Sequence, residues 1–110
     1  QYQSVAGAER PSSRVTAGRV RSNVMPQIFT FTVSDPEGMY ARPAGRLVAK
    51  AQEYESSITV AYGGRSVDAK RIFGVMGLDV QQGDEVTVRV QGNDEAVAAA
   101  EFERFLKEHL

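Results

Sequence analysis

The stretch GMYARPAGR, residues 38–46, marks the point where a strand gives way to a helix. Before it, QIFTFTV (27–33) alternates apolar and polar side chains with the period of two that is typical of a half-buried strand. SDPEG (34–38) then combines residue types that form turns. Pro43 suits the first turn of a helix, where its missing N–H costs nothing. The helix that we expect behind it has an apolar face made of Leu47, Val48, Ala51 and Tyr54.

The remainder of the chain shows the same short, well-separated elements. Alternating apolar residues predict three further strands, at 57–62, 65–69 and 85–90. Gly63 and Gly64 form a hairpin loop between the first two, and we expect a short helix at 71–78 and a longer one after residues 92–94. The order β-α-β-β-α-β-α predicts an α+β fold, an open-faced β-sandwich with one four-stranded, mainly antiparallel sheet and three helices on one face. The other face should be wet, since it is lined by Thr30, Thr32, Thr59 and Thr87.

The final helix has the signals of a capped, amphipathic segment. Asn93 or Asp94 is expected to accept hydrogen bonds from the unpaired N–H groups at its start, and Glu95 suits the positive end of the helix dipole. Glu103 and Lys107 are spaced to form an ion pair on the outer side. The buried face is expected to consist of Ala98, Ala99, Phe102, Phe105 and Leu106.

The composition is that of one globular domain, which we place at residues 27–110. Residues 1–26 carry four arginines against Glu9 alone and almost no large apolar side chains, so we expect a basic, flexible extension with Met25 as the natural start. The absence of cysteine excludes a disulfide framework and thiolate chemistry. No apolar run approaches the ~20 residues that span a membrane, and scattered arginines are weak evidence for nucleic acid, so we expect neither partner.

Two motifs carry a resemblance to a known family. GMYARPA (38–44) is similar to the Gly–apolar–His–Ala–Arg–Pro–Ala motif of HPr, the histidine-containing phosphocarrier of the bacterial phosphoenolpyruvate:sugar phosphotransferase system. DAKRIFGVMGL (68–78), followed by GDEVTV (83–88), is similar to the segment around the family's short middle helix. The resemblance covers residues 25–110. It implies a cytoplasmic carrier that has no catalytic turnover of its own and needs no cofactor or metal.

In that family the histidine accepts a phosphoryl group from Enzyme I and passes it to Enzyme IIA proteins, so the resemblance implies these partners. The N–H groups at a helix start attract anions, and Arg42 adds a fork of donors that suits phosphate. Arg42, Arg46 and Lys50 form a basic stripe at helical spacing. Lys70 and Arg71 extend the stripe, so the docking partner should be acidic. The resemblance adds an apolar docking group, with core packing as the alternative for its last three members: Met39, Ile72, Phe73 and Met76.

Two positions depart from the family pattern. Tyr40 stands where the family has its phospho-accepting histidine, and a phenol, with an ordinary pKa of about 10, is a poor nucleophile near neutral pH without an activating base. The motif offers no such base, and a tyrosine phosphate ester lacks the labile phosphorus–nitrogen bond of the carrier. The only histidine, His109, lies next to last in the final helix. Arg71 replaces a serine that a regulatory kinase phosphorylates in many Gram-positive relatives.

We therefore expect an HPr-like protein that does not carry phosphate as written. One alternative is a docking or regulatory module of the same system, and another is a carrier whose histidine was replaced recently or deliberately. A third, from a different class, is an acylphosphatase-type enzyme, which needs an asparagine to orient water. The only asparagines here are Asn23 and Asn93, neither of which lies in a phosphate-binding motif.

Overall fold

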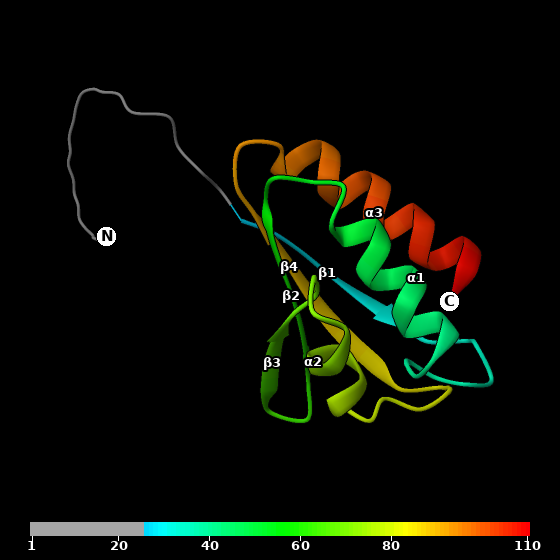
Figure 1. Ribbon diagram of the computed structural model, residues 1–110. Coiled ribbons are helices and arrows are strands. Elements are labelled where there is room, and N and C mark those ends of the chain that lie inside the picture. Colours follow the sequence, from blue (N-terminus) through cyan, green and yellow to red (C-terminus); the bar gives the residue numbers. More distant parts are fainter. Residues whose placement is uncertain (1–25) are drawn as a thin grey trace, which may run out of the picture.

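The computed structural model describes residues 26–110 and shows the predicted order of elements (Figure 1). The strands are β1 (Gln27–Thr32), β2 (Ser57–Tyr62), β3 (Arg65–Asp68) and β4 (Glu85–Gln91). The helices are α1 (Arg42–Ala51), α2 (Ile72–Gly77) and α3 (Glu95–His109). The order β-α-β-β-α-β-α is confirmed. The expected extension lies outside the described residues, except for Pro26.

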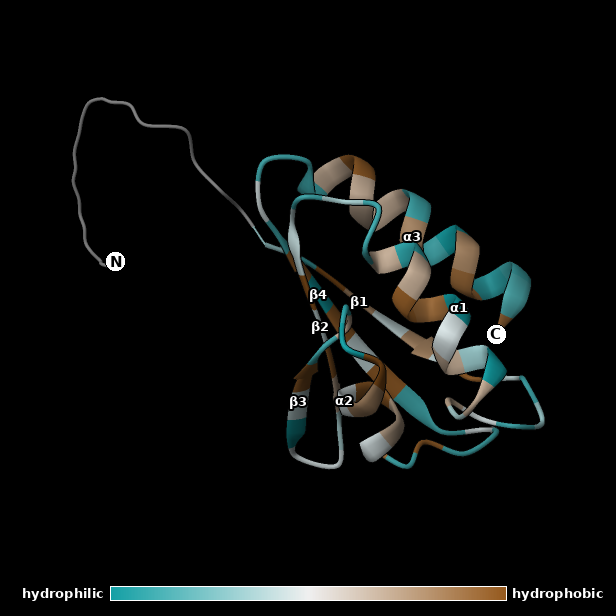
Figure 2. Ribbon diagram, viewed as in Figure 1, coloured by the Kyte–Doolittle hydropathy of each residue, from teal (hydrophilic) through white to brown (hydrophobic). Residues whose placement is uncertain are grey.

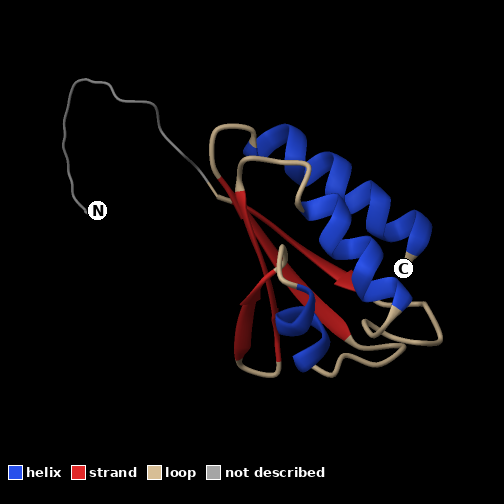
Figure 3. Cartoon of the chain, in the orientation of Figure 1, coloured by secondary structure: helices blue, strands red, loops and turns tan. Residues whose placement is uncertain are grey.

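The four strands form one sheet in the order β1-β4-β2-β3. Every neighbouring pair is antiparallel, so the sheet is fully rather than mainly antiparallel. All three helices lie on the same face, as predicted (Figure 3). The helix α3 packs on β1 and β4, while α2 packs on β3 and α1. Within residues 26–110, none of these helices combines the length and apolar character needed to cross a membrane.

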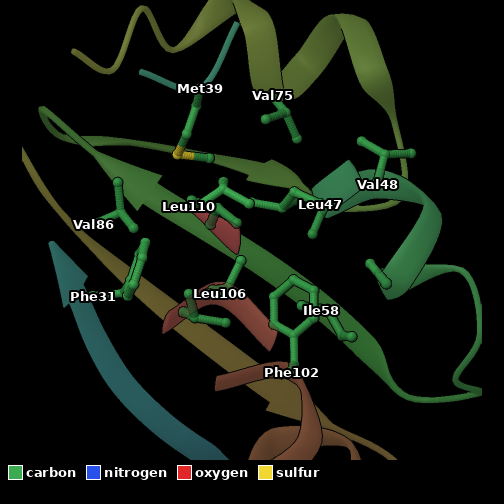
Figure 4. Close-up of a cluster of buried hydrophobic side chains, with 14 of the residues drawn as sticks. Phe31, Met39, Leu47, Val48, Ile58, Val75, Val86, Phe102, Leu106 and Leu110 are labelled. Carbon is green, nitrogen blue, oxygen red and sulfur yellow. The ribbon is translucent and has the colours of Figure 1, made fainter. Parts of the chain in front are cut away.

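The core fills the space between the sheet and the helices (Figure 4). Alternate strand residues such as Phe31, Ile58 and Val86 point into it and are almost fully buried. The helices α1 and α3 alternate hydrophobic and hydrophilic segments along their ribbons (Figure 2), and they direct Leu47 and Phe102 toward the sheet. Full burial of an apolar side chain of this size stabilises the fold by about 1.5–3 kcal/mol.

The structure also shows the predicted exposed face of the sheet and the predicted buried and outer faces of α3. On the open face of the sheet Thr30, Thr32 and Thr87 are exposed and Thr59 is partly exposed. On α3, the predicted inner residues are buried or, for Phe105, partly buried against the core. Lys107 and Glu103 form the expected ion pair, with 3.4 Å between Nζ and Oε2. Period-two and helical spacing thus predicted which faces are buried.

The start of α3 differs from the prediction. Asp94 is its N-cap residue, yet the side chain makes no capping hydrogen bond. Its carboxylate instead accepts hydrogen bonds from the backbone N–H groups of Glu55 at 3.0 Å and Ser56 at 2.9 Å, and from the Ser56 hydroxyl. Glu95 contributes by accepting a hydrogen bond from the N–H of Gly92 at 3.0 Å. Asp94 therefore joins the loop before α3 to the loop before β2, and it satisfies the buried Ser56 hydroxyl.

We expect Asp94→Ala to lower the free energy of unfolding by about 1–3 kcal/mol, because Ser56 and two N–H groups lose their acceptor. The Ser56 hydrogen bond lowers the pKa of Asp94 from its ordinary value of 3.8. The stabilisation is therefore present above pH 3.8 and is lost as the pH falls through the lower folded-state pKa. Urea unfolding at neutral pH and well below pH 3.8 measures both effects.

The matched control is Asn93→Ala, because Asn93 is the exposed neighbour of Asp94. Its unfolding free energy should stay within about 0.5 kcal/mol of the wild type at both pH values. Equal stability of the two variants at neutral pH would show that the Asp94 carboxylate does not join the loops.

Candidate functional site

The turn before α1 is held against the loop that precedes β4. The N–H of Glu37 donates to the Asp35 carboxylate at 2.8 Å, and the N–H of Gly38 donates to the Asp35 carbonyl at 2.9 Å. Gly38 has a φ of 68°, and a Cβ on it would lie 2.2 Å from the carbonyl oxygen of Val80. Only glycine permits this approach. The N–H of Met39 then donates to the same carbonyl at 3.0 Å.

Met39 is a core residue rather than a docking residue. Its side chain is 1% exposed and lies with Val75 and Leu47 above the sheet (Figure 4). The prediction that Met39 contacts partners is therefore wrong. The hydrogen bond to Val80 fixes the backbone with Met39 turned inward, and the next side chain, Tyr40, consequently turns outward with 59% of its surface exposed.

The N-terminus of α1 is open. No side chain among residues 26–110 caps it, and its first turn contains no acidic residue. Pro43 has no N–H, and the N–H of Gly45 donates to the carbonyl of Ala41 at 3.0 Å. The N–H groups of Arg42 and Ala44 are therefore left at the helix end, where the helix dipole favours an anion.

Ala41, the N-cap residue, has a backbone conformation that glycine normally adopts. Its φ is 54° and its ψ is −115°. A non-glycine residue in such a region costs on the order of 1–3 kcal/mol. The flanking residues hold it there, because Met39 and Ala44 are both buried in the core. Tyr40 and Ala41 therefore form a short bridge between two anchored residues.

Tyr40 has no hydrogen-bond partner within the described part of the chain. His109, the only imidazole, lies at the end of α3, and its ring packs on Phe105 with 4.6 Å between the centroids. No base is thus hydrogen-bonded to the phenol hydroxyl to activate it. Among residues 26–110 there is also no group of three or more His, Asp or Glu side chains that could hold a metal ion.

Only some side chains of the predicted basic stripe are available to a docking partner. Lys50 donates to Glu53 at 3.1 Å, which raises the pKa of Lys50, and its ammonium lies 5.6 Å from the ring centroids of both Tyr54 and Phe105. Lys70 donates to the carbonyl of Tyr54 at 2.7 Å. Both lysines are only partly exposed, and each already has a contact within the fold. Of the cations that the sequence predicted for docking, Arg42, Arg46 and Arg71 are exposed and form no ion pair with residues 26–110.

The predicted apolar docking residues also differ from one another in exposure. Phe73 is 82% exposed, so core packing does not explain it. Ile72 and Met76 are partly buried and pack against the core, which leaves each of them one accessible side. A groove between α1 and α2 lies beside Phe73, and three of its lining residues were not predicted as docking residues from the sequence, namely Val48, Gln52 and Gly74. Gln52 reaches the groove by donating to the carbonyl of Lys70 at 3.0 Å, a contact that helical spacing alone does not reveal.

Comparison with known proteins agrees with this geometry. The sequence model of one family, described as the PTS HPr component phosphorylation site, matches residues 28–108. The chain belongs to the HPr family. It is 49% identical to the phosphocarrier protein HPr of Lysinibacillus sphaericus over 65 residues, which are 59% of this chain and 74% of that protein. The comparison confirms the expected family.

Solved structures of the family have the same fold. The chain is similar to HPr-C-His of Thermoanaerobacter tengcongensis, with a TM-score of 0.72, 31% identity, and coverage of 76% of this chain and 93% of that one. It is also similar to Crh of Bacillus subtilis, with a TM-score of 0.61, 33% identity, and coverage of 84% and 98%. The protein is thus an HPr-like phosphocarrier-family protein of the phosphotransferase system rather than an enzyme with turnover. The acylphosphatase alternative is not favoured.

The strain at Ala41 generates a prediction. Ala41→Gly should raise the free energy of unfolding by about 1 kcal/mol, because glycine adopts this φ and ψ without strain and the relief exceeds the entropy that glycine loses on folding. Chemical denaturation of the purified variant measures the change.

Ala49→Gly is the matched control, since Ala49 is an exposed residue within α1. It should lower the free energy of unfolding by about 1 kcal/mol, the usual cost of glycine inside a helix. A loss of stability in both variants would show that Ala41 carries no strain.

Proposed function

We propose that this HPr-family protein docks on Enzyme I and on Enzyme IIA-type proteins in the cytoplasm, but does not carry phosphate between them. The observation that supports this most is the state of the site: the helix N-terminus and Arg42 remain open for a phosphate, while Tyr40 occupies the acceptor position. The anion-binding parts of the site are therefore retained, and the nucleophile is not.

The chemistry of Tyr40 argues against transfer. Attack by a phenol on a phosphoryl donor needs a base to remove the proton, and no residue among 26–110 is hydrogen-bonded to the Tyr40 hydroxyl. A phosphate ester that did form would lack the labile bond that allows onward transfer. A stable ester would stop the cycle after one step.

Docking does not need the acceptor side chain and depends only on the surface around it. Phe73 supplies an exposed aromatic side chain, and Arg42, Arg46 and Arg71 supply unpaired positive charge. An acidic partner with an apolar pocket fits this combination. Ile72 and Met76 contribute the accessible sides of two partly buried side chains at the same helix.

A regulatory role is the second candidate. The observation in its favour is the likeness to Crh, which is described as the catabolite repression HPr of Bacillus subtilis. By its resemblance to the family, Arg71 takes the position of a serine that is phosphorylated in many relatives. A guanidinium cannot be phosphorylated in that way, so a regulatory function of this chain would depend on docking alone.

We expect that incubation with Enzyme I and phosphoenolpyruvate leaves this chain unphosphorylated, because Tyr40 is not an activated nucleophile. Intact-mass spectrometry detects the gain of one phosphate. A stoichiometric, acid-labile phosphate on the wild-type chain would contradict the proposal.

The matched variant for this experiment is Tyr40→His. It should accept one phosphate under the same conditions, because the open helix N-terminus, Arg42 and Pro43 are already in place. If the folded variant stays unphosphorylated, other parts of the site are also incompetent, and the regulatory candidate gains support.

Docking gives a separate prediction. Phe73→Ala should weaken binding to Enzyme I by tens of fold, since a desolvated aromatic anchor is worth about 2 kcal/mol or more. Its melting temperature should change little, because 82% of the side chain is already exposed. Arg46→Ala should weaken binding less, and its effect should fade as salt rises. Calorimetric titration at two ionic strengths measures these affinities.

Val97→Ala serves as the control for Phe73→Ala. Val97 is another exposed apolar residue, 57% accessible, but it lies on α3, outside the proposed surface. Its affinity for Enzyme I should equal that of the wild type. An unchanged affinity in a stably folded Phe73→Ala protein would exclude Phe73 from the docking surface.

A further inference from the structure

The helix α2 is too short to be stable by itself. It has six residues, no side chain among residues 26–110 caps its start, and its first turn contains no acidic residue. Isolated helices shorter than about 12–15 residues are marginal in water. Val75 is the only residue of α2 that is buried in the core. The position of α2 therefore depends on contacts from neighbouring elements.

Two hydrogen bonds join the start of α2 to the end of α1. Lys70 comes directly before Arg71, the N-cap residue of α2. Gln52, the C-cap residue of α1, donates from its side-chain amide to the carbonyl of Lys70 at 3.0 Å. In the other direction, the ammonium of Lys70 donates to the carbonyl of Tyr54 at 2.7 Å. The backbone of each segment thus accepts a hydrogen bond from a side chain of the other.

Tyr54 gives the Lys70 hydrogen bond a fixed acceptor. Its side chain belongs to the core and is 9% exposed. Its hydroxyl donates to the carboxylate of Glu101 in α3 at 2.7 Å, and its N–H donates to the carbonyl of Ala51 in α1 at 3.3 Å. Lys70 therefore binds a residue that is itself attached to both of the longer helices.

The contacts of α2 with β3 are of a different kind. Arg65 of β3 donates to the carbonyl of Gly77 at 2.8 Å, one of the carbonyls at a helix end that lack an intrahelical partner. In the middle of the helix, a Cβ on Gly74 would lie 3.5 Å from the Cβ of Val67. These contacts hold α2 beside β3 (Figure 1), whereas the hydrogen bonds of Gln52 and Lys70 hold its start beside α1.

We propose that Gln52 and Lys70 are positioning residues for docking. They hold the start of α2 against the end of α1, and so keep Arg71 and Phe73 in a fixed place beside the exposed arginines of α1. The inference rests on the proposed function, because it concerns the same docking surface. That surface is divided between two helices, so its shape depends on how they are placed. A preformed surface loses less conformational entropy on binding than a mobile one.

Gln52→Met tests the positioning in the absence of a partner. Methionine is similar in length and uncharged, but it cannot donate to the carbonyl of Lys70. The N–H of Val75 donates to the carbonyl of Arg71 at 3.1 Å, so its hydrogen exchange reports the opening of the first turn of α2. We expect this exchange to become about three- to tenfold faster, which corresponds to the loss of one hydrogen bond. Exchange followed by NMR on the full chain measures the rate.

The experiment has an internal reference and a matched variant. The N–H of Ala98 donates to the carbonyl of Asp94 at 2.8 Å in α3, and its exchange should stay the same in Gln52→Met. Gln91→Met is the matched control, because Gln91 is partly exposed on β4 and its side chain makes no hydrogen bond to residues 26–110. It should leave the exchange of Val75 unchanged. Equal exchange of Val75 in the wild type and in Gln52→Met would overturn the proposal.

Lys70→Met tests the second hydrogen bond. A hydrogen bond from an ammonium is stronger than one from a neutral amide, so the loss of the Tyr54 contact should speed the exchange of Val75 about tenfold or more. A wild-type rate in this variant would show that α2 is held without Lys70, and the proposal would then be wrong.

A double-mutant cycle separates positioning from direct contact, since Gln52 also lines the groove beside Phe73. Calorimetric titration should show that Gln52→Met weakens binding to Enzyme I about threefold, because a surface that is competent for only part of the time binds more weakly in proportion. On the Phe73→Ala background the same change should leave the affinity nearly unchanged, since the side chain that it positions is absent.

The cycle has two adverse outcomes, which can be told apart. Equal weakening by Gln52→Met on both backgrounds would show that Gln52 contacts the partner directly, and it would overturn the positioning role. A wild type that does not bind Enzyme I would overturn the proposed function and, with it, the role of this contact in docking. In that case a faster exchange of Val75 in Gln52→Met would still show that the contact holds α2 in place.

Discussion

The close contact between Gly38 and the carbonyl of Val80 is the constraint on which the site depends. It exists because residue 38 has no Cβ and takes a φ of 68°. Once the backbone is held there, Met39 is turned into the core and Tyr40 is turned into solvent. The chain must then reach the buried Ala44 in a few residues, and it does so through the unusual backbone of Ala41. The exposed phenol follows from that contact, whereas the helix N-terminus is open because no side chain among residues 26–110 caps it.

Fewer basic side chains are open to a partner than the helical spacing predicts. A lysine has a long, flexible stem and donates to whichever acceptor is within reach. Lys50 finds Glu53 and two aromatic rings, and Lys70 finds a backbone carbonyl, so both become part of the scaffold. The arginines at the helix starts have no such partner among residues 26–110. Phe73 is also exposed and is not packed in the core. These arginines and Phe73 form a surface that is suited to an acidic, partly apolar partner.

Local patterns predicted the elements because each pattern reflects a local geometry. Period-two alternation in residues 27–33 and helical spacing in the final helix identified the buried faces, since a strand or a helix fixes where each side chain points. The prediction that the Asn93 or Asp94 side chain caps the final helix was wrong, because a capping hydrogen bond depends on which donors lie near the side chain in space. A carboxylate has several nearby donors, and the Ser56 hydroxyl and N–H, which lie 38 residues away in the chain, are bound by Asp94 in place of its own helix.

The sequence by itself determined the order of elements, the open-faced architecture and the resemblance to HPr, because these rest on short-range periodicity and on two motifs. It also placed Tyr40 and Arg42 together at a helix start, since residues so close in the chain share one turn. Only the tertiary structure decided that Met39 is buried, that Lys50 and Lys70 are engaged, and that Phe73 is free. The burial of Met39 and the hydrogen bond of Lys70 depend on segments from elsewhere in the chain, whereas Lys50 binds the nearby Glu53 and also contacts Phe105 of α3. Spacing along the sequence specifies which face a side chain occupies, but not what lies across from it.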